Sequence, residues 1–165
     1  MRQNALFQLA TGLGTPGTAR KEDFSIATAS AVQTAKVSTE ERDDHFVVRN
    51  GVRCAGAHLI VDLYEAERLD DIDHIEDALR RAVDAANATL LHIHLHHFEP
   101  NGGVSGVAVL AESHISIHTW PEAHYAAIDI FMCGRANPDA CVPVLREAFK
   151  PKNIAVSELL RGQGV

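Results

Sequence analysis

Hydrophobic and polar residues recur with two different periods after about residue 55, and each period predicts one kind of element. The run 57–64 (AHLIVDLY) is short and apolar, which is typical of a buried strand. The acidic pair Asp70–Asp71 offers an N-cap, and the positions after it predict a helix of about 17 residues. The hydrophobic residues at helical spacing are Ile72, Ile75, Leu79, Ala82, Val83 and Ala86.

The run 89–98 (TLLHIHLHHF) alternates with period two and predicts a strand. Leu91, Ile93 and Leu95 would share one face, opposite the histidines. Three more strands, a second helix and a last strand follow, at 104–110, 114–118, 125–132, 137–149 and 153–160. This order, β-α-β-β-β-β-α-β, predicts an α+β two-layer sandwich, with two helices on one face of a mostly antiparallel sheet.

The first fifty residues show neither period. They are rich in Ala, Thr, Ser and Gly, and they contain a polar run at 38–44 (STEERDD). We therefore expect a flexible N-terminal extension over 1–50 and a single domain over 51–165. The early apolar patch is broken by Gln8 and is followed by no small-residue cleavage site, so we do not expect a secretory signal.

Composition and charge narrow the classes of protein. A chain of 165 residues with 46% hydrophobic residues can form one packed domain. The net charge of -7 argues against a nucleic-acid partner, and no run approaches the roughly 20 apolar residues of a membrane span. The three cysteines, Cys54, Cys133 and Cys141, are too few and too widely spaced for a disulfide framework, so we expect a cytoplasmic protein.

Histidines at 92, 94, 96 and 97 raise the question of a metal site. The three that share a strand face span roughly 14 Å, so one ion could hardly take all three. We expect a polar, partly solvated face and no metal.

The segment 103–134 gathers most of the residues that could carry chemistry. They are Ser105, Glu112, Ser113, His114, Ser116, His118, Glu122, His124, Asp129 and Cys133. A serine, a histidine and a cysteine on adjacent short strands can meet in a cleft, where a base activates the hydroxyl and the thiol transfers a proton. The residue types alone are a weak signal, because serine and histidine are common on half-exposed strand faces.

The order of these residues is more specific. The runs AESHISIHTWPE (111–122) and YAAIDIFMCG (125–134) closely resemble the bacterial and archaeal S-adenosylmethionine decarboxylase proenzymes. The resemblance extends back through HHFEPNGGVSG (96–106) and GAHLIVDLY (56–64). It implies that the chain cuts itself between Glu112 and Ser113, giving residues 1–112 and 113–165. Ser113 would become a pyruvoyl cofactor at the start of the second chain.

The same resemblance implies roles for six further residues. In processing, His118 would remove the Ser113 α-proton and Ser105 would assist. In decarboxylation, Cys133 would protonate the product carbon. Phe98 and Trp120 would sandwich the adenine of S-adenosylmethionine, and Glu122 would bind its ribose hydroxyls. The family is dimeric, with active sites that use residues of both subunits, so a homodimer is implied.

Elementary chemistry agrees with these roles. A carbonyl that forms a Schiff base with the substrate amine can absorb the charge left by loss of carbon dioxide. Self-cleavage needs a strained or polarised scissile carbonyl, so we expect a tight turn at Glu112–Ser113. The product, decarboxylated S-adenosylmethionine, would serve spermidine synthesis.

Besides a metal-binding protein that uses the histidine strand, two other functions stay open on the sequence. One is a pyruvoyl-dependent ornithine or arginine decarboxylase on the same scaffold. The other is an unprocessed, inactive regulatory paralogue. Phe98, Trp120 and Glu122 argue against the first, because a small basic amino acid needs no adenine clamp. Ser105, Ser113, His118 and Cys133 together argue against the second.

Overall fold

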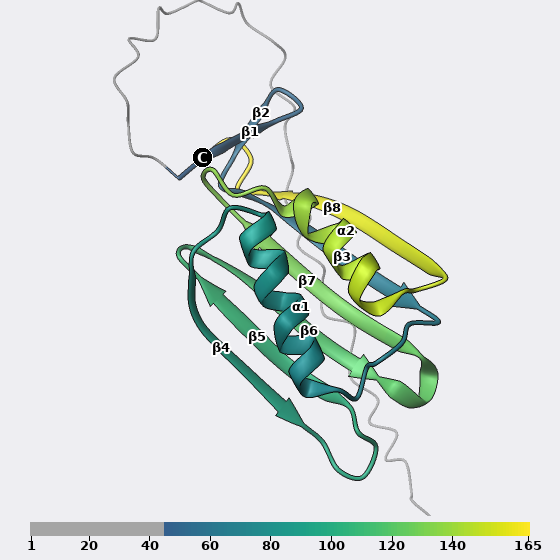
Figure 1. Ribbon diagram of the computed structural model, residues 1–165. Coiled ribbons are helices and arrows are strands. Elements are labelled where there is room, and N and C mark those ends of the chain that lie inside the picture. Colours follow the sequence, from purple (N-terminus) through teal and green to yellow (C-terminus); the bar gives the residue numbers. More distant parts are fainter. Residues whose placement is uncertain (1–44) are drawn as a thin grey trace, which may run out of the picture. The chain divides into compact units, whose positions relative to one another are not determined.

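The computed structural model describes residues 45–165, and six of their strands form one sheet (Figure 1). The six are β3 (Gly56–Tyr64), β4 (Leu90–His97), β5 (Val104–Leu110), β6 (Ser113–Trp120), β7 (Tyr125–Met132) and β8 (Asn153–Arg161). Their order is β4-β5-β6-β7-β3-β8, and every neighbouring pair is antiparallel.

Two helices, α1 (Ile72–Ala85) and α2 (Cys141–Phe149), cover one face of this sheet (Figure 1). The Asp71 side chain caps α1 by accepting the backbone N–H of His74 at 3.0 Å. The predicted α+β two-layer sandwich is confirmed. Neither helix is long and apolar enough to cross a membrane, nor is any other in the described part of the chain.

The core lies between the helices and the inner face of the sheet. Alternate strand residues point inward, and in β7 these are Ala126, Ile128, Ile130 and Met132, each at most 1% exposed. The other face of the sheet, called the outer face below, is covered by no helix of residues 45–165. It carries His58, Ser116, His118, Trp120 and Asp129 from β3, β6 and β7.

The predicted second helix is divided. A short 3₁₀ helix, η2 (Pro138–Ala140), comes first, and α2 begins at Cys141. The Asn137 side chain caps η2 by accepting the N–H of Asp139 at 3.2 Å. Pro143 lies in the first turn of α2, where a helix tolerates the missing N–H.

One predicted side-chain direction is wrong. The register of β4 shifts between Leu90 and His92, so Leu91 leaves the alternation and is 64% exposed. Leu90 instead packs against the core beside Ile93 and Leu95. A bulge of this kind inserts one extra residue, and a strict period of two cannot foresee it.

A hairpin that the sequence reading missed precedes the main sheet. It pairs β1 (Val47–Arg49) with β2 (Val52–Cys54) through the turn residues Asn50 and Gly51. Both turn residues have positive φ, 52° and 78°, as an Asn-Gly turn requires. The extension predicted over 1–50 lies mostly in residues 1–44, outside the described part of the chain.

Candidate active site

The bond between Glu112 and Ser113 lies at a tight hairpin turn. Leu110 pairs with Ser113 at the end of the β5–β6 ladder, which leaves Ala111 and Glu112 as a two-residue loop. Glu112 has φ 66°, in the left-handed region. That conformation costs a residue with a side chain about 1–2 kcal/mol. The turn expected here is therefore present, with strained backbone at Glu112.

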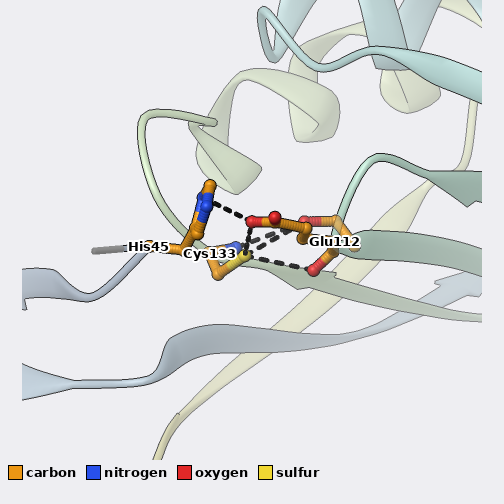
Figure 2. A network of polar contacts seen from close by, with 4 residues as sticks. His45, Glu112 and Cys133 are labelled. Atoms are coloured by element: carbon orange, nitrogen blue, oxygen red, sulfur yellow. Dashed lines mark hydrogen bonds and ion pairs between the residues drawn. The ribbon is translucent and has the colours of Figure 1, made fainter. Parts of the chain in front are cut away.

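Cys133 lies across this turn, one residue beyond the end of β7 (Figure 2). Its thiol donates to the Glu112 carbonyl oxygen at 3.1 Å. Its backbone N–H donates to Ser113 Oγ at 3.3 Å, and the two side-chain atoms, Sγ and Oγ, are 3.8 Å apart. Cys133 thus contacts residues on both sides of the Glu112–Ser113 bond. A donor at a carbonyl oxygen polarises that carbonyl toward nucleophilic attack.

His45 is a fourth residue at this turn, and nothing in the sequence indicated its role. Its Nδ1 pairs with a carboxylate oxygen of Glu112 (Figure 2), and its carbonyl oxygen accepts the N–H of Gly134 at 2.7 Å. No motif or period marks this histidine, because its partner is distant in sequence. We call Glu112, Ser113, Cys133 and His45 the turn cluster.

A cavity of about 530 Å³ opens beside the turn cluster. Its lining is His45, Phe46, Ala55, Glu112, Phe131 and Cys133. Two aromatic rings and the thiol therefore face a space that could admit a small molecule.

A second group of candidate residues lies at the other end of the β5–β6 hairpin. Ser105 pairs with His118 in the ladder, and Ser105 Oγ lies 2.9 Å from His118 Nδ1. Phe98, Trp120 and Glu122 join these two around a cavity of about 210 Å³. We call the five residues the pocket cluster.

Buried contacts hold the strands of the pocket cluster in place. The Thr119 hydroxyl donates to the Leu69 carbonyl at 2.7 Å and accepts the N–H of Val104 at 2.8 Å. A Cβ on Gly103 would meet the Thr119 carbonyl oxygen at 2.9 Å, so only glycine allows this approach. Phe98 and Trp120 are 49% and 42% exposed. The Trp120 ring packs against Tyr125, with ring centroids 5.3 Å apart, so each residue keeps part of its surface open to a flat ligand.

The two clusters do not meet within one chain. Ser113 and His118 are five positions apart on β6, about 17 Å along an extended strand. Their side chains also point to opposite faces of the sheet. Ser113 is two positions before the buried Ile115 and shares its face, whereas His118 lies on the outer face. The turn cluster and the pocket cluster can form one site only if another copy supplies one of them.

The outer face between the clusters has its own polar contacts. Ser116 Oγ donates to Asp129 at 3.1 Å, and the same carboxylate lies 3.3 Å from His58 Nε2. Tyr125 donates its hydroxyl to Asp62 at 2.5 Å. That hydrogen bond to a carboxylate, helped by desolvation, raises the pKa of Tyr125 to about 12.

The remaining cysteines and histidines form no site. Cys54 and Cys141 are buried free thiols, and Cys141 donates to the Ala82 carbonyl at 3.4 Å. Burial raises the pKa of Cys141 to about 12, which keeps its thiol protonated. Within residues 45–165, no three His, Cys, Asp or Glu side chains are grouped so that they could hold a metal ion.

Comparison with known proteins gives matches over most of the described region. The family model S-adenosylmethionine decarboxylase matches residues 57–162. The S-adenosylmethionine decarboxylase proenzyme of Thermomicrobium roseum is 48% identical over 112 residues, which are 67% of this chain and 97% of that protein. The proenzyme of Methanococcus aeolicus is 47% identical over 113 residues, 67% of this chain and 96% of its own.

A solved structure agrees with these sequence matches. The adenosylmethionine decarboxylase of Aquifex aeolicus superposes with a TM-score of 0.60 at 35% identity, covering 66% of this chain and 92% of that one. The fold and the matches define the class, a decarboxylase of the carboxy-lyase type. More narrowly, the chain belongs to the S-adenosylmethionine decarboxylase family.

Proposed function

We propose that this chain is a proenzyme that cuts itself at Glu112–Ser113 and then decarboxylates S-adenosylmethionine with a pyruvoyl group made from Ser113. The single observation that best supports cleavage at Glu112–Ser113 is the geometry of the turn. There a left-handed Glu112 offers its carbonyl oxygen to the Cys133 thiol at 3.1 Å, next to the Ser113 hydroxyl.

The cleavage balances with water as the only co-reactant. Ser113 Oγ attacks the Glu112 carbonyl carbon, and the amide becomes an ester as the acyl group moves from nitrogen to oxygen. Removal of the Ser113 α-proton then breaks the Cβ–Oγ bond, leaving a carboxylate on Glu112 and a dehydroalanine. Water converts the dehydroalanine to a ketone and releases ammonia. The two products are residues 1–112 and 113–165.

Cys133 serves both stages of this proposal. Before cleavage, its thiol donates a hydrogen bond to the Glu112 carbonyl oxygen, where negative charge would develop during the attack. After cleavage, the same thiol would lie beside the start of β6 and could deliver its proton to the product carbon.

The residues around Ser113 fit a pyruvoyl group. The group supplies a ketone that accepts the electrons released with carbon dioxide. It would lie at the partly buried start of β6, beside the Cys133 thiol and the cavity of about 530 Å³. Phe46 and Phe131 line that cavity and give it an apolar wall.

The pocket cluster suits the nucleoside end of the substrate. A planar adenine can stack between Phe98 and Trp120. The Glu122 carboxylate can accept hydrogen bonds from the two ribose hydroxyls. A sulfonium cation is also attracted to aromatic faces. These groups give no advantage to a small basic amino acid.

We further propose a homodimer, because the α-proton of Ser113 needs a base that its own chain holds about 17 Å away. A second copy that packs on the outer face would bring a pocket cluster to a turn cluster. That face carries five large hydrophobic side chains that are 36–49% exposed, which favours such packing. They are Ile60, Tyr64, Val109, Trp120 and Leu159. The three cysteines are free, which suits a reducing cytoplasm.

The deciding experiment is the intact mass of the purified protein under denaturing conditions, with and without a carbonyl-trapping hydrazine. Two chains of residues 1–112 and 113–165, the second gaining the mass of a hydrazone, would support the proposal. A single unreactive chain would overturn it and favour an inactive paralogue. Carbon dioxide release from S-adenosylmethionine, measured against ornithine and arginine, then decides the substrate.

A further inference from the structure

The N-terminal hairpin, residues 45–54, precedes the segment that matches the family model, residues 57–162. Ion pairs fix it to the domain. Arg49 bonds Asp139 at 2.5 Å and Glu158 at 2.7 Å, and its own side chain is only 24% exposed. This hairpin is therefore a docked part of the domain.

Docking of the hairpin puts His45 on the turn cluster (Figure 2). The backbone carbonyl of His45 accepts the N–H of Gly134, which follows Cys133 directly. The His45 ring pairs with the Glu112 side chain. One residue thus links the strand end that carries the thiol to the turn that carries the scissile carbonyl.

We propose that His45 is a positioning residue for the self-cleavage proposed above. Glu112 needs support, because its left-handed conformation is unfavourable and its turn has only two loop residues. The pairing with His45 anchors the Glu112 side chain. That anchor keeps the Glu112 carbonyl directed at the Cys133 thiol, where the attack by Ser113 is assisted.

His45 acts through the Glu112 side chain and touches neither the scissile carbonyl nor Ser113. The pair is partly exposed, with side chains 58% and 49% accessible, so its contribution is modest. Both partners belong to residues 1–112, so the proposed cleavage would leave them on the same piece.

The test follows the appearance of the two product chains by mass spectrometry during cell-free synthesis of the full chain. For His45→Ala we expect cleavage about fivefold slower, the upper range for a partly exposed ion pair. His45→Asn keeps a side-chain N–H near the position of Nδ1 and should cleave within about twofold of the wild type. Val48→Ala, in the same hairpin and 70% exposed, is the matched control and should cleave at the wild-type rate.

A double-mutant cycle separates positioning from a general loss of structure. If His45 acts through Glu112, then His45→Ala adds no further slowing to a Glu112→Ala chain. The proposal is overturned if His45→Ala cleaves at the wild-type rate, or if His45→Asn slows cleavage as much as His45→Ala does. Additive effects of the two substitutions in the cycle would also overturn it. A wild-type chain that never splits would instead overturn the proposed function.

Discussion

The thiol of Cys133 donates a hydrogen bond of 3.1 Å to the carbonyl oxygen of Glu112. These residues are 21 positions apart in the chain, and the β6–β7 ladder brings them together. The contact places an acid at the oxygen that gains negative charge when Ser113 attacks. It also places the same acid beside the residue that would become the cofactor.

Replacing Cys133 should therefore impair both stages. We expect Cys133→Ala to cleave roughly a hundredfold more slowly, because one donor to the developing oxyanion is lost. Cys133→Ser restores a donor and should cleave faster than the alanine variant. The rates are read from the two product chains on denaturing gels. Cys141→Ala removes the buried thiol outside the site and is the control; equal cleavage by all three variants would contradict the assignment.

His118→Ala should stall the reaction after the acyl shift, because the Ser113 α-proton then has no base. The stalled chain carries an ester between Glu112 and Ser113. Neutral hydroxylamine attacks esters and spares amides, so it should cut this variant into two chains. Ser113→Ala cannot form the ester and should remain one folded, inactive chain with hydroxylamine as without it.

The proposed dimer would make the same two variants complementary. When His118→Ala and Ser113→Ala chains are co-expressed, a mixed dimer holds one intact Ser113 and one intact His118 on different subunits. We expect cleavage of the His118→Ala chain alone, visible if the two chains carry tags of different mass. Absence of any cleavage in verified mixed dimers would contradict a shared site.

Substitutions in the pocket cluster should act on substrate binding. For Trp120→Leu we expect KM for S-adenosylmethionine to rise roughly tenfold, since one aromatic face of the adenine site is lost. Glu122→Gln should also raise KM, because a neutral amide accepts the ribose hydroxyls less strongly. Steady-state kinetics on fully cleaved protein give both values, and Leu91→Ala, an exposed change on β4, is the control.

The hydrogen bond between Tyr125 and Asp62 should make the stability of the protein depend on pH in the alkaline range. Its pKa is raised to about 12 in the folded protein by the hydrogen bond to Asp62, against an ordinary value of 10.0. The unfolded chain therefore releases the proton first, and the stabilisation is lost as pH rises from about 10 to about 12. Tm of the wild type should fall more steeply over this range than Tm of Tyr125→Phe. Parallel curves would show that the contact contributes nothing.

Periodicity predicted the main sheet and α1 well, because burial of one face imposes a regular alternation. It could not predict the bulge that exposes Leu91, because no residue in 89–98 marks the point where the register of the strand shifts. The Asn50–Gly51 pair between two valine-containing runs is a hairpin signal in the sequence, and the structure has a hairpin there.

The candidate site divides in the same way. The residues of the pocket cluster come from two nearby runs, 96–106 and 111–122, and the structure places all five at one cavity. The separation of Ser113 from His118 follows from strand geometry. It suggests a site shared between two copies only once the positions of the other site residues are known. The position of His45 depends on how residues 45–54 dock, and no local pattern encodes that docking.

The sheet order has a consequence for the cleaved enzyme. Residues 1–112 supply β4, β5 and β3, and residues 113–165 supply β6, β7 and β8, so β3 lies between two strands of the other piece. Neither piece retains a continuous sheet by itself. The uncut chain would refold as a single molecule, whereas the two pieces of the proposed cleavage would have to find one another. Recovery of the cleaved form from denaturant would then be a second-order process that slows on dilution, unlike recovery of the uncut chain.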